Sequence, residues 1–449
     1  MATIVSQLVA LTSRVAYEDL SQATIAAAKR AILDALGCGI AALGCEPSKI
    51  AARAMPNGPC GDATVIGDKD LSFTHRAVLL NGILVRYLDM MDVYWAKDVC
   101  HPAENVPAAL ACVESVEGSG RRLIEAVVAG YEAQLRLTHA MSLQQMAMHH
   151  VAAGGIVAPL VVGKAWGMDP EAIEHAVALA GCRQFTLHGL SKGGLSMAKA
   201  IGYAWSAMSS VMASRLASEG FTGPTDFLDW LSDKSVLKLP IDRKALEHDG
   251  TYLIERVSFK QFPVQFELQT TGEIAIRLSK KIRDSGSTIE SVEIDVAPVT
   301  IERTADAAKF KPANRETADH SLPASVAMAL LDGKLTAAQF EHDRWADADV
   351  AALIAKITVI PNSEYPTKYP KGRPAGFRVK LANGETLADF QAVPSGDAEK
   401  PMDDATLEAK FVANASEAFG EARAREIVEA VREVERIERL GELTRLLRP

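Results

Sequence analysis

Long alanine-rich segments with apolar residues at helical spacing restrict the fold of this chain most strongly. The first follows Ser21, which can cap a helix N-terminus, and its apolar residues recur every three or four positions: Ile25, Ala28, Ile32, Leu36, Ile40 and Leu43. The same period returns in RRLIEAVVAGYEAQLRLTHAM, EAIEHAVALAGCRQF and AIGYAWSAMSSVMASRLASEG, with Gly, Pro or Asp at the breaks. We therefore predict that residues 1–265 are almost entirely helical.

Strand patterns follow this helical part. SVEIDVAP alternates apolar residues from Val292 to Val296, and KITVIPN is a short β-branched run. FRVKLANGETLADF places two alternating runs on either side of Asn383-Gly384, a dipeptide that favours the type I′ turn of a β-hairpin. Residues 266–397 are predicted to form a smaller α+β domain.

The end of the chain is helical again. One apolar stripe runs through it, at Ile427, Val431, Val434, Ile437, Leu440, Leu443 and Leu447. We predict that residues 398–449 return to the helical domain. Two domains also suit the length, because 449 residues exceed the roughly 250–300 at which a single core stops growing. The predicted fold is mostly α, with a large all-helical domain and a smaller α+β domain.

Charge and cysteine usage exclude several classes of partner. The formal net charge is −9 and no run of Lys or Arg is present, which argues against nucleic acid. Apolar stretches such as GGIVAPLVVG are too short to span a membrane, and the N-terminus lacks the basic start of a signal peptide. The six cysteines show neither CxxC pairs nor zinc-finger spacing, so we expect reduced thiols and a cytoplasmic location.

The densest group of ionisable residues lies in RYLDMMDVYWAKDVCHPAEN. Asp89 and Asp92 are three residues apart, one helical turn, before a loop that ends at His101. Two carboxylates and an imidazole are therefore expected to lie close together. From residue types alone, caps and turns at the end of an apolar helix explain these residues more simply than a functional site does.

Three further groups hold candidate site residues. His149-His150 precede a predicted helix whose N-terminus favours anions, although a core or surface histidine pair is the simpler explanation. In GLSKGGLSMAKAIGYAWSA, Lys192 lies in a Gly-rich loop as a candidate substrate-binding residue. Lys199 lies in an apolar helix, where it needs an anion or must extend its amine to water. Lys260, in SFKQFPVQFELQ, lies close to the predicted domain junction, where ligand clefts are common.

The sequence lacks the motifs of several common enzyme classes. It contains no GxGxxG between a strand and a helix, no P-loop, no HExxH and no GxSxG. The candidate residues also lack a recognisable set of ligands for zinc or an iron–sulfur cluster. Proton transfer next to a carboxylate, with no metal and no organic cofactor, is therefore the natural hypothesis for an enzyme.

Several segments taken together resemble the 2-methylcitrate dehydratase (MmgE/PrpD) family, whose relatives include cis-aconitate decarboxylase and iminodisuccinate epimerase. The matching segments are NGILVRYLDMMD, HPAENVPAALA, HHVAAGGIVAPLVVGKAWGMD, LSMAKA, EGFTGP, SFKQFPV and RETADHSLPASVAMALLDG, in family order over nearly the whole chain. The resemblance implies a pocket between a large helical domain and an α+β lid. It also implies a homodimer and a reaction that needs no metal or organic cofactor.

The resemblance assigns site residues one by one. The pocket residues of the family fall on Asp89, His101, His150, Lys199 and Lys260. Two further residues stand in matching segments. Asp92 belongs to the same DxxD string, and His320 lies in the ADHS segment, where a structural role is equally expected.

Two positions depart from the family pattern. Family members often carry His where this chain has Glu267, and Tyr where it has Ala324. Both usual side chains can donate hydrogen bonds to an anionic substrate, whereas Ala cannot and Glu would repel carboxylates. We therefore expect a substrate that differs from 2-methylcitrate, with fewer carboxylates, an extra neutral group or a cationic amine.

The predicted function is a cofactor-independent lyase, similar to 2-methylcitrate dehydratase, that acts on a small polycarboxylate-like acid. His101 and His150 would transfer protons, Asp89 would orient an imidazole and raise its basicity, and Lys199 and Lys260 would bind carboxylates. Two alternatives use the same pocket: decarboxylation of an aconitate-like acid and epimerisation of a dicarboxylate. A third alternative is a non-catalytic protein that binds a small acid.

Overall fold

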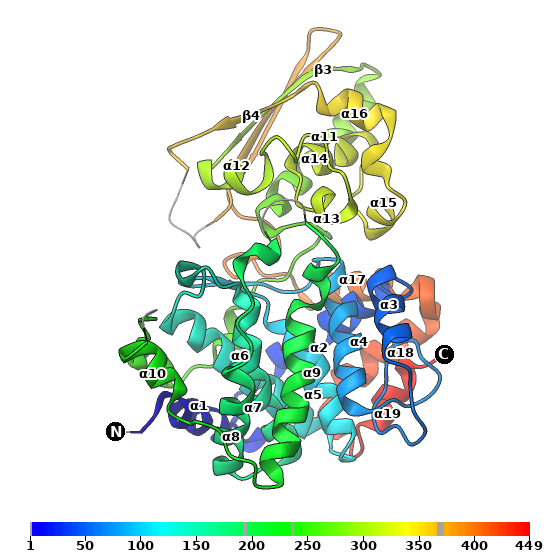
Figure 1. The fold of residues 1–449 in the computed structure, drawn as a ribbon. Coiled ribbons are helices and arrows are strands. Elements are labelled where there is room, and N and C mark those ends of the chain that lie inside the picture. The colour runs from blue at the N-terminus through cyan, green and yellow to red at the C-terminus, as the bar shows by residue number, and fades with distance from the viewer. Residues whose placement is uncertain (1, 192–194, 236–237, 366–371) are drawn as a thin grey trace.

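The computed structural model describes residues 2–191, 195–235, 238–365 and 372–449, and they form two domains (Figure 1). Lys192 lies outside the described residues. The larger domain is helical and contains both ends of the chain, and the smaller one combines helices with a sheet. This arrangement confirms the predicted mostly helical fold with a smaller α+β domain. No helix among the residues that the structure describes is long and apolar enough to cross a membrane.

The larger domain is built from helices that pack around one apolar core. Its core residues come from positions 4–257 and again from 411–447. Ser21 accepts a hydrogen bond from the Thr24 amide, so the predicted cap is confirmed. Its first ten helices are α1 (Ile4–Ser13), α2 (Gln22–Ala41), α3 (Glu46–Ala54), α4 (Thr74–Tyr87), α5 (Val106–Glu114), α6 (Gly120–Ala140), α7 (Gly154–Trp166), α8 (Pro170–Gly181), α9 (Ala198–Ser218) and α10 (Phe227–Asp233). A two-stranded antiparallel ribbon, β1 (Tyr94–Trp95) and β2 (Val99–Cys100), follows α4.

The smaller domain, the lid, packs helices against one mixed sheet. Its separate core contains residues from positions 262 to 381. The sheet order is β4-β3-β5-β6, with β3 and β4 parallel and the other pairs antiparallel. The predicted hairpin joins β5 to β6, but its turn is not the type I′ turn that Asn383-Gly384 favours. The Gly384 amide donates to the Leu381 carbonyl, so Ala382 and Asn383 are the central residues, and only Gly384 has a positive φ, of 89°. The elements are α11 (Gln269–Ser285), β3 (Ile289–Val296), α12 (Pro298–Thr304), α13 (Arg315–Ala318), α14 (Leu322–Asp332), α15 (Ala337–Glu341), α16 (Ala348–Ile354), β4 (Ile357–Pro361), β5 (Ala375–Leu381) and β6 (Thr386–Gln391).

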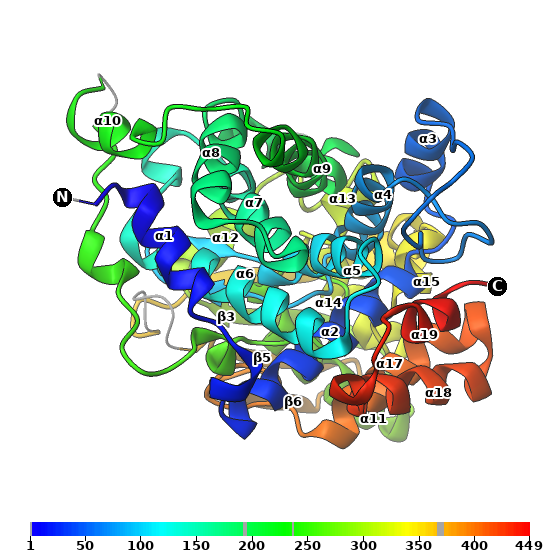
Figure 2. The same ribbon diagram turned by 90° about the horizontal axis from the view of Figure 1, so that it is seen from below.

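The C-terminal segment returns to the helical domain, where it lies beside α2 in the view of Figure 2. It forms α17 (Asp404–Phe419), α18 (Glu421–Arg432) and α19 (Gly441–Thr444), so the apolar stripe predicted from 427 to 447 is not one continuous helix. The break has a tertiary cause. The Leu440 amide donates to the Gly118 carbonyl, and the Gly120 amide donates to the Ile437 carbonyl. Hydrogen bonds to the α5–α6 loop therefore replace the helical ones.

Candidate active site

A cavity of about 250 Å³ lies between the two domains. The structure brings seven of the residues singled out from the sequence to its wall: Asp89, His101, His150, Lys199, Lys260, Glu267 and His320. The first five belong to the helical domain and the last two to the lid. Asp92 and Ala324 do not line this cavity.

Asp89 lies at the centre of the charged groups. It follows α4 with a φ of 52°, in the left-handed region that a non-glycine residue seldom adopts. Its carboxylate accepts a short hydrogen bond from Arg86, and the Nζ atoms of Lys260 and Lys199 lie 3.2 and 3.6 Å from its oxygens. Burial alone would raise the pKa of Asp89, but the two lysines and Arg86 hold it well below its ordinary value. Asp89 is therefore a permanent anion.

The two lysines bind different partners around this anion. Lys260 is 1% exposed and donates a 2.6 Å hydrogen bond to the main-chain carbonyl of Asp89. Burial lowers the pKa of Lys260, while Asp89 opposes that effect. The Lys199 Nζ lies 3.4 Å from both carboxylate oxygens of Asp319, in the lid, as well as 3.6 Å from Asp89. Lys199 is 7% exposed, so its amine meets two carboxylates and does not extend to water.

His101 is held in one tautomer by the protein main chain. Its Nδ1 lies 2.7 Å from the carbonyl oxygen of Asp92, which can only accept, so Nδ1 carries the proton and Nε2 presents a lone pair. The Asp92 main chain thus orients His101, while the orienting role predicted for Asp89 toward an imidazole stays a prediction, with His320 Nε2 3.7 Å from its carboxylate. Burial, followed by the charges of Lys260 and Arg86, lowers the pKa of His101 well below its ordinary value. The ring is therefore neutral at pH 7 and able to accept a proton.

Four other histidines line the cavity: His149, His150, His188 and His320. His150 precedes α7, and its ring centre is 5.3 Å from that of His101. Its Nε2 is buried and has no hydrogen-bond partner among the described residues. Burial lowers the pKa of His150 well below its ordinary value, and the neighbouring His149 and His101 lower it further. His320 donates a short hydrogen bond to Asp319 through Nδ1, and its Nε2 lies 3.7 Å from Asp89.

Asp92 supports the site from beneath the cavity. Its carboxylate accepts hydrogen bonds from the Tyr131 hydroxyl at 2.7 Å and the Ala103 amide at 2.8 Å. Burial raises the pKa of Asp92 to about 7, against the effect of those hydrogen bonds. The carboxylate and the carbonyl of this one residue therefore hold both sides of the turn that carries His101.

The two positions that depart from the family pattern lie in different places. Glu267 lines the cavity from the short 3₁₀ turn Phe266–Leu268, and Arg303 of α12 donates a 2.7 Å hydrogen bond to it. Burial would raise the pKa of Glu267, but the guanidinium groups of Arg373 and Arg303 lower it. Ala324 is fully buried in α14, within the lid core. A missing phenol ring at this position therefore does not enlarge the cavity.

Sequence reasoning missed several residues of the site. Arg86 has a local signal, because it stands three residues before Asp89, in the last turn of α4. Asp319 is the immediate neighbour of His320. Lys410 of α17 has no such signal. Its Nζ donates to Asp34 at 2.6 Å, to the Lys260 carbonyl at 2.6 Å and to the Met90 carbonyl at 3.1 Å.

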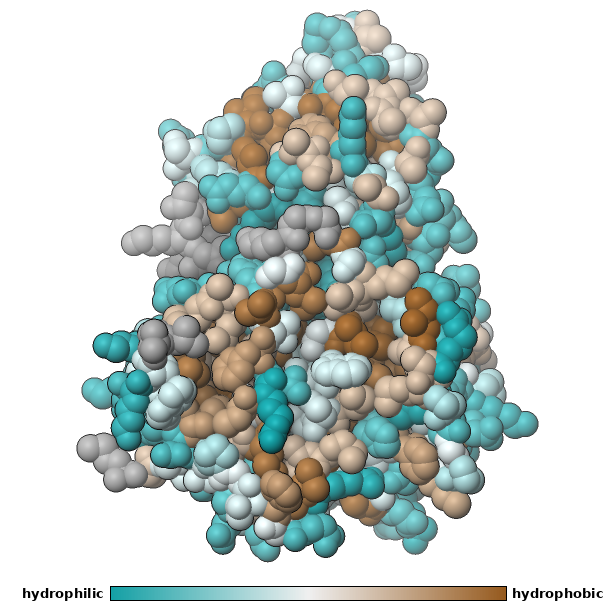
Figure 3. Space-filling view, in the orientation of Figure 1, coloured by the Kyte–Doolittle hydropathy of each residue, from teal (hydrophilic) through white to brown (hydrophobic). Residues whose placement is uncertain are grey.

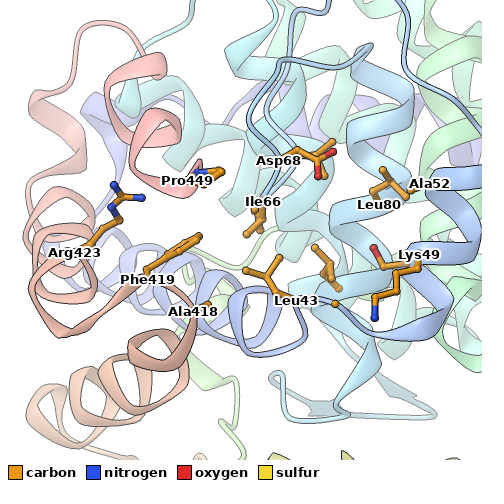
Figure 4. A pocket seen from close by; sticks show the side chains of 15 residues that line it. Leu43, Lys49, Ala52, Ile66, Asp68, Leu80, Ala418, Phe419, Arg423 and Pro449 are labelled. Atoms are coloured by element: carbon orange, nitrogen blue, oxygen red, sulfur yellow. The ribbon is translucent and has the colours of Figure 1, made fainter.

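A larger hollow of about 630 Å³ lies elsewhere, between α2, α3, α4 and the C-terminal helices (Figure 4). Its floor is mostly apolar, with Leu43, Ile66 and Leu80 among the side chains shown. Lys49 and Asp68, which also line it, are exposed, and no histidine lines it. The smaller interdomain cavity, which gathers histidines, lysines and Asp89, is therefore the better candidate for the active site. No three His, Cys, Asp or Glu side chains are grouped as metal ligands within the described part of the chain.

Comparisons with known proteins point to one family. The model of the MmgE/PrpD N-terminal domain matches residues 6–233, and that of the MmgE/PrpD C-terminal domain matches residues 262–436. A 2-methylcitrate dehydratase from Cupriavidus necator is 27% identical over 86% of this chain and 83% of its own. One from Salmonella typhimurium is 26% identical over 96% and 92%, and human cis-aconitate decarboxylase is 26% identical over 96% and 91%.

Proposed function

The chain belongs to the MmgE/PrpD family, and from that premise we propose that it is a cofactor-independent lyase that eliminates water from a small polycarboxylate-like acid. Its relatives are dehydratases and a decarboxylase, which places it among the enzymes of the family. One observation carries the proposal most directly. His101 presents a neutral Nε2 in a buried cavity whose wall also holds Arg86, Lys199 and Lys260.

The arrangement suits removal of a proton from carbon next to a carboxylate. His101 takes the proton through Nε2, and the cations Lys199, Lys260 and Arg86 stabilise the charge that builds on the substrate carboxylate. The departing hydroxyl leaves as water after it receives a proton. That proton comes from the imidazolium that His101 has become, so the ring returns to its neutral state; His150, whose ring centre lies 5.3 Å away, borders the same cavity.

Decarboxylation is the second candidate, because human cis-aconitate decarboxylase is among the relatives. Three readouts on one panel of di- and tricarboxylic acids separate the reactions. Dehydration creates a conjugated alkene that absorbs in the ultraviolet, decarboxylation releases CO₂, and epimerisation exchanges solvent deuterium into the substrate. We expect the alkene signal to dominate, with activity unchanged in EDTA.

The matched variants for this assay are His101→Gln and His139→Gln, because His139 pairs with the Tyr94 hydroxyl at the end of α6 and does not line the cavity. Replacing the base should reduce turnover by on the order of 10²-fold or more, whereas His139→Gln should retain most of it. Binding of an acid by the wild type without any of the three signals would favour the non-catalytic alternative. Loss of turnover in EDTA that is restored by a metal ion would contradict a cofactor-independent mechanism.

We also propose that the protein works as a homodimer in the cytoplasm, with a small carboxylic acid as its ligand and no nucleic-acid or membrane partner. All six cysteines are free thiols, as expected for a reducing compartment. Light scattering on the purified protein tests the homodimer. Fractionation of cells that express the protein tests the cytoplasmic location.

A further inference from the structure

A further cation lines the cavity from the lid, at a more exposed place than the two lysines and next to the carboxylates of Glu302 and Asp306. Arg303 of α12 lies there with its side chain 35% exposed, compared with 7% for Lys199 and 1% for Lys260. It belongs to the lid, whereas the two lysines belong to the helical domain. The cavity therefore has positive groups at its buried floor and at its outer rim.

Glu267 fixes the position of Arg303. The Glu267 carboxylate is 1% exposed and accepts a 2.7 Å hydrogen bond from the Arg303 Nη1. A buried carboxylate beside a guanidinium restricts the rotamers of both side chains and keeps the guanidinium at the rim. In this chain Glu267 thus acts on a ligand through Arg303.

Aromatic rings support the same arrangement. The Arg303 guanidinium carbon lies 5.8 Å from the ring centre of Trp95, which extends from β1 of the helical domain. The Arg373 guanidinium carbon lies 5.1 Å from that ring and 5.4 Å from the ring of Phe266. Two arginines and one buried carboxylate thus gather around Trp95, and of these two arginines only Arg303 lines the cavity, beside Glu302 and Asp306.

This geometry argues against a cationic amine as the group that Glu267 recognises. An amine would need the carboxylate of Glu267 to be available, but that carboxylate already lies beside Arg303 and within the field of Arg373. An ammonium group placed here would also face two guanidinium groups at short range. A second carboxylate of the ligand suits the rim better.

We propose that Arg303, held in place by Glu267, is a specificity-determining residue that binds a second carboxylate of the substrate while the first lies near Lys199 and Lys260. The inference rests on the proposed function for the identity of the site. It deepens that proposal, because it selects acids with at least two carboxylates over monocarboxylates and over amino acids.

The test measures binding by calorimetry, so that it does not depend on turnover. The probes are propane-1,2,3-tricarboxylate, glutarate and butyrate, with glutamate as the amino-dicarboxylate. Arg303→Gln should weaken binding of the first two acids by about 10-fold or more and leave butyrate unchanged. Arg303→Lys should give an intermediate loss, since lysine keeps the charge but lacks the planar fork. Glu267→Gln should also weaken binding of propane-1,2,3-tricarboxylate and glutarate, because Arg303 would no longer be held in position by the carboxylate.

Arg277→Gln is the matched control, because Arg277 pairs with Asp389 on the surface of the lid and does not line the cavity. It should change none of the affinities. The proposal is overturned if Arg303→Gln weakens the binding of all three acids equally, or changes the binding of none of them. It is also overturned if the wild type binds none of the three acids. It is also overturned if the wild type prefers glutamate and Glu267→Gln abolishes that preference. If Arg303→Gln selectively loses di- and tricarboxylate binding but the wild type shows no lyase activity, the role of Arg303 in binding is supported and the proposed function is contradicted.

Discussion

Asp89 combines a strained backbone with a dense set of ion pairs. A non-glycine residue in the left-handed region costs about 1 kcal/mol or more. Its conformation turns the carboxylate toward Arg86, Lys199 and Lys260, whose attraction offsets the cost. Asp89→Gly would remove the backbone strain and the carboxylate charge together. Asp89→Asn removes the charge but keeps a side chain of similar shape, so it measures the contribution of the charge alone.

Lys199→Ala should lower kcat/KM by on the order of 10²-fold, the usual scale for a group that stabilises developing charge. It should also lower the melting temperature, because Asp89 and Asp319 would lose a shared buried cation. Lys199→Arg should restore most of the melting temperature but less of the turnover. Kinetics and thermal unfolding of both variants check this. Unchanged kcat/KM in the alanine variant would remove Lys199 from the reaction.

The buried histidines should make stability depend on pH. Burial lowers the pKa of His149 to about 3, and the pKa values of His101 and His150 are lowered too. Each is neutral when folded and gains a proton more readily when unfolded, so stability should fall as pH drops below about 6.5, by up to roughly 1.4 kcal/mol per pH unit for each histidine. Depressed pKa values of Asp89 and Asp319 add to this loss only below about pH 4.

Chemical denaturation of the wild type and His149→Gln between pH 8 and pH 4.5 measures this effect. The glutamine oxygen can accept the Val151 amide hydrogen that His149 Nδ1 accepts at 3.3 Å. The variant should therefore show a shallower pH dependence, and the two proteins should converge in slope above pH 7. Identical slopes throughout would show that His149 does not titrate on unfolding.

At the scale of elements, α17 connects the end of the chain to the active site. Lys410 donates to the main-chain carbonyls of Met90 and Lys260, and so it ties together the two loops that carry Asp89 and Lys260. Asp34 of α2 compensates its charge at 2.6 Å. Lys410 lines no part of the cavity, which makes it a positioning residue.

Lys410→Met should lower kcat by about 10-fold or more while KM changes less, because the catalytic groups move relative to each other. Lys29→Met is the matched control. Lys29 also joins α2 to the C-terminal segment, through Glu435 at 2.6 Å and the Arg432 carbonyl at 2.7 Å, but away from the cavity. Steady-state kinetics and melting temperatures of both variants decide the matter. Equal kinetic losses in both would mean that Lys410 supports only the fold.

The elements differ in how far the sequence predicts them. Local rules predict α2 from the spacing that follows Ser21, and the β5–β6 hairpin from Asn383-Gly384, because both depend on neighbouring residues. They do not predict the break after α18, which follows from backbone hydrogen bonds to the distant α5–α6 loop. The pair of Asp319 with Lys199, and the role of Lys410, were missed for the same reason. Their roles exist only after the lid and α17 pack against the helical domain.

At the scale of the whole molecule, α9 presents an apolar outer face. Trp205, Met212 and Leu216 are 51%, 46% and 47% exposed along this helix. Figure 3 shows brown patches among pale and teal residues over the part of the helical domain where α9 runs in Figure 1. A face this apolar on an outer helix suits a symmetric contact with a second copy of the chain, in agreement with the homodimer that the resemblance implies.

We expect light scattering to give the mass of a dimer for the wild type and of a monomer for Trp205→Glu combined with Leu216→Glu. Phe390→Glu is the control, because Phe390 is equally exposed, at 56%, but lies on β6 of the lid. It should leave the mass unchanged. A monomeric wild type would contradict both the homodimer and the assignment of this face.

Lys199 of the helical domain pairs at once with Asp89 of its own domain and Asp319 of the lid. Each domain therefore supplies one carboxylate to a shared cation, in addition to the pairs of Asp89 with Arg86 and Lys260 and of Asp319 with Arg315 inside their own domains. Recombination could join this helical domain to the lid of a diverged relative and would preserve both hydrophobic cores. The charges around Lys199 would change unless that lid also carried an aspartate at the position of Asp319. We therefore expect the two halves of such genes to be inherited together, and chimaeras between relatives to fold more often than they function.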